Sequence, residues 1–186
     1  PPMKDVMQTI RERAASLGVP HVFFTVTHTH HAPEMDVPNA PHADAVRDAT
    51  LEAIADAVDG LHPARIGVGS TTFDIAHNRR RMLDGGRCAM LWRNEGRLPT
   101  EPVDREATLI RLDAADGPPL AVLVHFACHP VVMGPSNRKY SADYVGELRR
   151  LVQSASGCPC IFLQGACGDI NPYLDKTPVD AGGEDA

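Results

Sequence analysis

The chain has 186 residues, of which 43% are hydrophobic and 23% are charged, and its formal net charge is −6. This composition is typical of a folded domain and not of a disordered chain, and the length suits a single domain over residues 1–186 with its own hydrophobic core. The negative charge argues against a nucleic-acid partner, because nucleic-acid binders usually carry a basic stripe. No apolar run approaches the roughly 20 residues that cross a bilayer, so we expect no transmembrane segment.

The first third of the chain predicts two helices separated by a strand. Apolar residues at helical spacing predict a helix over 3–17, and Gly18 ends the pattern. The β-branched and aromatic run 21–27 predicts a buried strand, which a polar loop over 28–33 follows. A second amphipathic pattern predicts a helix over 43–58.

The remainder of the chain predicts strands interrupted by one further helix. The run 65–72 has the pattern of a strand, and residues 107–127 have that of a β-hairpin. Asp143 is placed to cap a helix over 144–155, and the apolar run 160–163 predicts one more strand. Strands and helices that alternate, with one hairpin among them, predict an α/β fold with a mixed β-sheet flanked by helices.

Two histidines, His28 and His30, stand at the end of the strand predicted over 21–27. In an extended chain, residues two positions apart face the same side. Two imidazoles on one side could bind a metal together, or one could bind it while the other transfers protons. A pair of solvated loop histidines is the alternative.

Other polar residues also follow predicted strands, where open α/β sheets place their ligands. His129 comes after the strand that ends the hairpin, so two strand ends offer an imidazole, and zinc hydrolases use about three protein ligands. Arg79 belongs to the basic run 79–81, which is either a solvated surface or the source of a guanidinium that stabilises an oxyanion. The glycine-rich stretch 164–172 permits close approach to a ligand, or is a structural turn.

Four short motifs, in chain order, resemble those of the neutral/alkaline ceramidase family. They are His28–Pro33, similar to the family's His-Thr-His-Ser-Gly-Pro; Asn78-Arg79, similar to Asn-Arg-Ser; Phe126–Pro130, similar to Phe-Ala-x-His-Pro-Thr; and Gly165–Pro172, similar to Asn-x-Gly-Asp-Val-Ser-Pro. Because they span most of the chain in the same order, the chain resembles part of the N-terminal catalytic domain of that family.

The resemblance implies a zinc ion held by His28 and His129, with His30 and Arg79 as the catalytic residues for proton transfer and for the amide carbonyl. It implies hydrolysis of an N-acyl amide, ceramide in the family, to a fatty acid and an amine. The implied partner is therefore a small-molecule lipid or N-acyl substrate, with peripheral contact to a membrane surface. A secreted or periplasmic location is the corresponding expectation.

The chain also departs from the family pattern. Asn171 stands where the family has a serine, which leaves metal-activated water as the nucleophile. The family completes its zinc shell with a Glu and a Tyr from further downstream, so we expect the chain to be a partial one, with 176–186 as a loop or truncated end. Two alternatives stay open: a non-catalytic domain that binds lipid or a partner, and a zinc hydrolase for an ester or peptide bond.

Overall fold

The computed structural model describes residues 2–34, 40 and 42–177, so most of the loop predicted over 176–186 lies outside the described residues. The chain divides into two compact units. The first consists of Pro1–Phe24 and Pro33–Pro63, and the second of Thr25–Ala32 and Ala64–Ala186. Every residue of the site described below belongs to the second unit.

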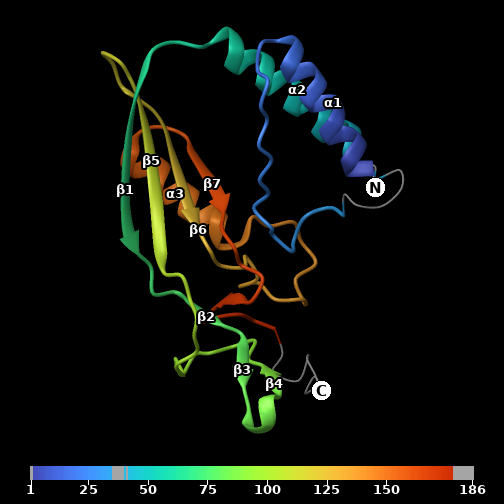
Figure 1. The fold of residues 1–186 in the computed structure, drawn as a ribbon, viewed down its shortest axis with the longest axis vertical. Coiled ribbons are helices and arrows are strands. Elements are labelled where there is room, and N and C mark those ends of the chain that lie inside the picture. The colour runs from blue at the N-terminus through green and yellow to red at the C-terminus, as the bar shows by residue number, and fades with distance from the viewer. Residues whose placement is uncertain (1, 35–39, 41, 178–186) are drawn as a thin grey trace. The chain divides into compact units, whose positions relative to one another are not determined.

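The first unit contains two helices that pack on each other (Figure 1). They are α1 (Pro2–Ser16) and α2 (Ala43–Asp59), and both confirm the helices predicted from apolar spacing. Val6 and Ile10 of α1 are buried, and Ile54 of α2 packs against the same apolar cluster. Burial of these apolar faces is what stabilises the pair, because isolated helices of this length are marginal in water.

The second unit is built on a four-stranded mixed sheet (Figure 1). Its strand order is β1 (Ala64–Thr72), β5 (Glu106–Ala114), β6 (Pro119–Phe126) and β7 (Cys160–Gln164). β1, β5 and β6 pair antiparallel, whereas β7 is parallel to β6 and is reached through helix α3 (Asp143–Ser156). The predicted α/β class, the mixed sheet and the antiparallel hairpin are all confirmed.

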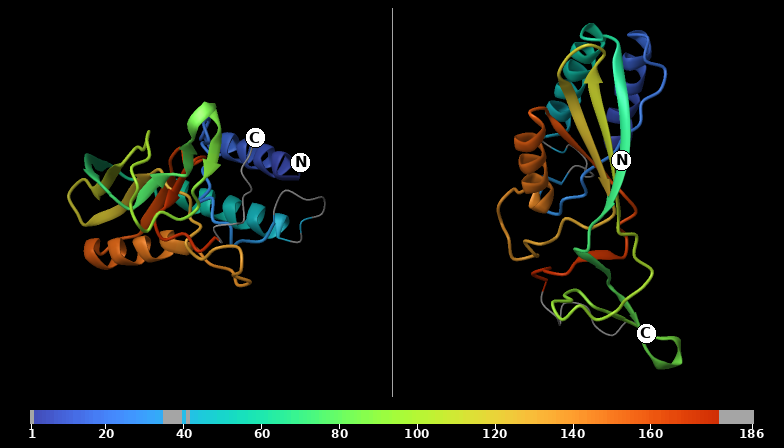
Figure 2. Two further views of the ribbon diagram at one scale, coloured as in Figure 1. Left: turned by 90° about the horizontal axis from the view of Figure 1, so that it is seen from below. Right: turned by 90° about the vertical axis from the view of Figure 1, so that its left-hand side faces the viewer.

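Helix α3 covers one face of this sheet (Figure 2). The core between them contains Phe126 of β6 and Phe162 of β7, with Val145 of α3, and Phe126 is fully buried. Among the helices in the described part of the chain, none combines the length and the apolar character needed to cross a membrane.

The strand directions bring three chain segments to the same edge of the sheet. β1 and β6 are both antiparallel to β5, so they run the same way, and β7 runs with them. Their carboxyl ends therefore lie at one edge, which is where open sheets place their ligands. Beyond that edge, β2 (Ala76–Asn78) pairs antiparallel with β8 (Ile170–Pro172), and β3 (Arg80–Met82) pairs with β4 (Cys88–Met90), with a short 3-10 turn at Asp84–Gly86.

The prediction of a buried strand over 21–27 is wrong. These residues are in an irregular conformation and pair with no other strand of the described chain. Phe23 is 90% exposed and Val26 is 65% exposed, whereas Val22 and Phe24 are partly buried against the apolar cluster of the first unit. A β-branched and aromatic run forms a strand only where a neighbouring strand and a surface to pack on are present.

Candidate metal centre and its pocket

Three histidines from two distant segments of the chain lie together. The ring centroids of His28 and His129 are 4.8 Å apart, those of His28 and His30 are 5.2 Å apart, and those of His30 and His129 are 5.5 Å apart. One potential ligand nitrogen from each residue lies within 4.8 Å of the other two. His129 is buried, so its ring is held in place, whereas the rings of His28 and His30 are exposed and have room to rotate. Three imidazoles at this separation are a donor set that suits zinc.

His129 is held by the backbone at Ile170. Its main-chain N–H donates to the carbonyl oxygen of Ile170 at 2.9 Å, and its Nδ1 lies 3.3 Å from the same oxygen. Because a carbonyl only accepts, Nδ1 is the protonated ring nitrogen, and the lone pair of Nε2 is left for a metal. A ligand histidine oriented by a carbonyl on its other nitrogen is the usual arrangement in metal sites.

The surroundings keep two of these imidazoles neutral. The pKa of His129 is lowered to about 4, mainly by burial and then by the nearby Arg79, His28 and His30, against a smaller opposite effect of the Ile170 carbonyl. Burial is also the main cause that lowers the pKa of His30, followed by His28, His31 and Arg79. Both rings are therefore unprotonated at pH 7, which is the form that binds a metal or accepts a proton.

A loop, and not a strand, positions His28 and His30. The Thr29 hydroxyl donates to the carbonyl of Ser141 at 2.8 Å and accepts from the His31 N–H at 3.3 Å. The Ser141 N–H in turn donates to the carbonyl of His31 at 3.0 Å. His28 has a φ of 60°, in the left-handed region that non-glycine residues rarely adopt, so the histidine pair follows a turn fixed by these bonds.

Asp143 joins the two loops that carry the histidines. Its carboxylate, with a fully enclosed side chain, accepts from the main-chain N–H groups of Val132 at 3.1 Å and Met133 at 3.0 Å, just after His129. The Nε2 of His31 lies 3.6 Å away, which is too far for a hydrogen bond. The sequence predicted Asp143 as a helix cap. It does accept from the Tyr144 N–H at 2.8 Å, but α3 begins at Asp143 itself, so the carboxylate acts mainly as a bridge.

Arg79 reaches the site because β2 pairs with β8. Its main-chain N–H donates to the carbonyl of Asp169 at 2.7 Å, and its Nη2 donates to that of Gly168 at 2.8 Å. The guanidinium lies over the ring of Trp92, 5.0 Å from the centroid, and its Nε is buried without a hydrogen-bond partner in the described structure. Burial lowers the pKa of Arg79, but a guanidinium remains charged at pH 7. The alternative prediction, that the basic run is a solvated surface, applies only to Arg80 and Arg81, which are exposed.

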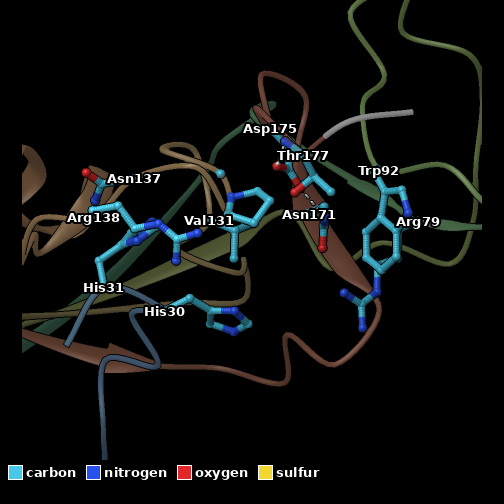
Figure 3. Close-up of a pocket in the computed structure, with 12 residues that line it drawn as sticks. His30, His31, Arg79, Trp92, Val131, Asn137, Arg138, Asn171, Asp175 and Thr177 are labelled. Carbon is cyan, nitrogen blue, oxygen red and sulfur yellow. Dashed lines mark hydrogen bonds between the residues drawn. The ribbon is translucent and has the colours of Figure 1, made fainter. Parts of the chain in front are cut away.

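A pocket of about 530 Å³ opens beside the histidines, a size that suits a small-molecule ligand (Figure 3). His30, His31 and Arg79 line it together with Asn171, the residue that stands in place of the family serine. The buried side-chain amide of Asn171 donates to Asp175 at 2.7 Å, while its Oδ1 has no partner in the described residues. Asn171 is therefore at the site, as the motif comparison implied.

All four predicted site residues come together here. His28 and His129 are neighbours in the three-histidine cluster, and both His30 and Arg79 line the pocket next to it. The sequence did not single out Asp143 as a bridge or Trp92 as the platform for Arg79. Trp92 could have been noticed because it is the one tryptophan of the chain. The neighbouring sequence, however, does not indicate that its ring packs against an arginine.

Comparison with known proteins shows which solved structures share the fold of this chain. Neither a protein-family model nor a curated protein sequence matches the chain. Among solved structures, it matches a ceramidase complexed with C2, with a TM-score of 0.68 and 19% identity over 91% of this chain. It also matches the neutral ceramidase from Pseudomonas aeruginosa, with a TM-score of 0.63 and 20% identity over 95% of this chain. The chain has a ceramidase-like fold.

The chain spans 29% of the first of these structures and 31% of the second. The likeness therefore covers most of this chain, but less than a third of the length of each neighbour. At this level of identity the likeness concerns the fold, and the chemistry has to be argued from the side chains above.

Proposed function

We propose that this chain forms part of a zinc-dependent hydrolase that cleaves an N-acyl amide bond in ceramide or a ceramide-like lipid. The observation that carries the proposal is that His28, His30 and His129 form one cluster, and that His30 also lines a pocket with Arg79. These four residues come from three separate segments of the chain. The ceramidase-like fold supports the same reaction class, because its neighbours are ceramidases.

His28 and His129 are the proposed zinc ligands, with His30 close enough to be a third ligand or to exchange protons. When bound there, zinc would lower the pKa of a water molecule to about 7 and polarise the scissile carbonyl. The fit rests on the donor set itself: neutral imidazoles, one of them oriented by the carbonyl of Ile170.

The residues around the cluster suit the remaining tasks of amide hydrolysis. His30 is neutral at pH 7, so it can take a proton from the attacking water and return it to the leaving amine. Arg79 holds a fixed positive charge and lines the pocket together with His30. It can therefore stabilise an oxygen that becomes negative during amide attack, and a preorganised donor of this kind is typically worth about 10²–10³ in rate. Asn171 has no nucleophilic group, so the chain's own residues offer no covalent route at that position.

The first test is the zinc content of the purified protein, measured by elemental analysis in the wild type and in His28→Ala and His129→Ala. His62→Ala is the matched control, since His62 is an exposed histidine of the other unit whose ring contacts the Gly60 carbonyl. We expect about one zinc per chain in the wild type and in His62→Ala, and loss of zinc in the two site variants. Circular dichroism checks that all four proteins fold.

Substrate assays follow on zinc-loaded protein, with ceramide beside ester and peptide substrates of the same acyl chain. Hydrolysis of the amide by the wild type, together with the loss of this activity in Arg79→Gln and in His30→Ala, supports the proposal. A folded wild type without zinc, or zinc retained in both site variants, contradicts the metal centre. Zinc binding with cleavage of the ester alone contradicts the amide assignment.

A further inference from the structure

Among the described residues, the pocket beside the histidines is lined by two guanidinium groups and one carboxylate. The arginines are Arg79, between β2 and β3, and Arg138, in the loop after His129, and the acid is Asp175. Figure 3 shows both arginine side chains directed into the space that His30 also lines. The whole chain carries a net charge of −6, so this local excess of positive charge runs against the average.

Burial lowers the pKa of Arg79, whereas the charges of Asp169 and Asp175 raise it and so offset part of its positive charge. Both oxygens of Asp175, however, accept hydrogen bonds from other groups. One oxygen of Asp175 accepts from the Asn171 amide at 2.7 Å, and the other accepts from the Thr177 N–H at 2.7 Å. Arg138 forms no hydrogen bond or ion pair within the described part of the chain, and it is exposed. Arg79 also lines the pocket, where its Nη2 donates to the Gly168 carbonyl at 2.8 Å. The pocket thus offers the donors of Arg138 without acceptors in the described structure, beside the positive charge of Arg79.

The loop that carries Arg138 is fixed in place. Its first residues are held by the Asp143 carboxylate, and the Gly134 N–H donates to the carbonyl of Val131 at 3.0 Å. Asn137 bonds both main-chain groups of Lys139, donating at 2.8 Å and accepting at 3.2 Å, so it brackets Arg138. A side chain presented from such a braced loop loses less freedom when it binds a ligand, which favours recognition.

We propose that this pocket recognises an anionic group, a carboxylate or a phosphate, and that the substrate is accordingly an acidic N-acyl amide rather than neutral ceramide. This inference rests on the hydrolase function proposed above. Two guanidiniums on one pocket suit a carboxylate or phosphate, since each can donate two parallel hydrogen bonds to such a group. A neutral alkyl or hydroxyl head group would leave Arg138 without a counter-ion in the described structure.

Binding of three matched ligands tests the inference without any chemistry. They are N-lauroylglycine, its neutral analogue N-lauroylethanolamine, and N-lauroylphosphoethanolamine, which share one acyl chain. Calorimetric titration of the metal-free protein, below the micelle concentration, gives the dissociation constants. We expect the anionic ligands to bind about tenfold or more tightly than the neutral one in the wild type. The ratio between the two anionic ligands tells carboxylate from phosphate.

Arg138→Gln should remove most of that preference, and Arg138→Lys should keep part of it because the charge stays while the fork is lost. Arg65→Gln is the matched control, because it removes the same charge from an exposed position on β1. A preference that is absent in the wild type, or that falls equally in Arg65→Gln, overturns the inference. If Arg138→Gln does not fold, Arg138→Lys and the ligand ratios in the wild type still decide it.

Hydrolysis of the same three compounds and of ceramide by zinc-loaded protein separates the two proposals. Cleavage of ceramide with no preference for the acidic amides overturns the anionic pocket and leaves the hydrolase standing. A binding preference that depends on Arg138, with no cleavage of any amide, supports the pocket and contradicts the hydrolase.

Discussion

Replacement of Asp143 by alanine tests whether one carboxylate holds the candidate metal site together. The enclosed carboxylate accepts from three main-chain N–H groups and lies 3.6 Å from His31. The Tyr144 N–H, in the first turn of α3, can be hydrated in the variant, so the loss is dominated by Val132 and Met133. Hydrogen bonds to a charged group contribute roughly 1.5–3 kcal/mol each, so we expect the free energy of unfolding to fall by about 3–5 kcal/mol.

The assay is thermal or urea unfolding followed by the fluorescence of Trp92, the only tryptophan of the chain and a residue of the same unit. A loss of that size corresponds to a fall of roughly 10 °C or more in the midpoint. Asp143→Asn keeps the shape and one acceptor, so it should lose about half as much. Asp116→Ala, in the exposed turn between β5 and β6, should hardly move the midpoint.

Zinc affinity gives a second measurement on the same variants. If Asp143 orients the loops that carry the histidines, Asp143→Asn should weaken zinc binding by about 10- to 100-fold, as is typical for groups that position metal ligands. An Asp143→Ala protein within about 1 kcal/mol of the wild type would refute the reasoning, because the loops would then be held by other contacts.

Three further predictions concern acid stability, a glycine and the core. The pKa of His129 is lowered to about 4 from 6.5, so the unfolded chain takes up the proton first as the pH falls. The metal-free protein should therefore lose up to about 3 kcal/mol of stability between pH 6.5 and pH 4, and a His129→Gln protein with the same acid sensitivity would contradict this. Gly134 has a φ of 68°, and an added Cβ would lie 2.8 Å from the Lys176 backbone, whereas Gly157 has a φ of 72° and open space. Gly134→Ala should then destabilise by about 2–4 kcal/mol in urea unfolding and Gly157→Ala by only about 1 kcal/mol, and equal losses would rule out the contact with Lys176. Phe126→Ala should cost about 3–5 kcal/mol in the same assay, since Phe126 is fully buried, and a loss below about 1 kcal/mol would show that the core closes around the gap.

Local sequence patterns were sufficient to predict the elements that form through contacts between residues close in the chain. The helix over 3–17 and the hairpin over 107–127 each depend on contacts between residues close in the chain, and both are present as α1 and as β5 with β6. The position of His129 was also predictable, because a histidine after a buried strand that is parallel to its neighbour must lie at the carboxyl edge of the sheet.

Prediction from the sequence failed where the conformation of a segment depends on a partner far along the chain. The run 21–27 has the composition of a strand, yet no other strand in the described structure pairs with it, so composition alone misled. His28 is nevertheless next to His129, because Thr29 bonds the main chain at Ser141 and so brings the loop to the site.

By itself, the sequence determined the class of the fold, the order of its elements and the residue types available for a metal site. Those properties follow from periodicity and from side-chain chemistry, which are local. Only the tertiary structure decided that the Arg79 guanidinium packs over the ring of Trp92, and that a buried Asp143 carboxylate bridges the two histidine loops. These facts arise from hydrogen bonds and packing between segments far apart in the chain, and no local pattern records which distant groups will satisfy a buried charge.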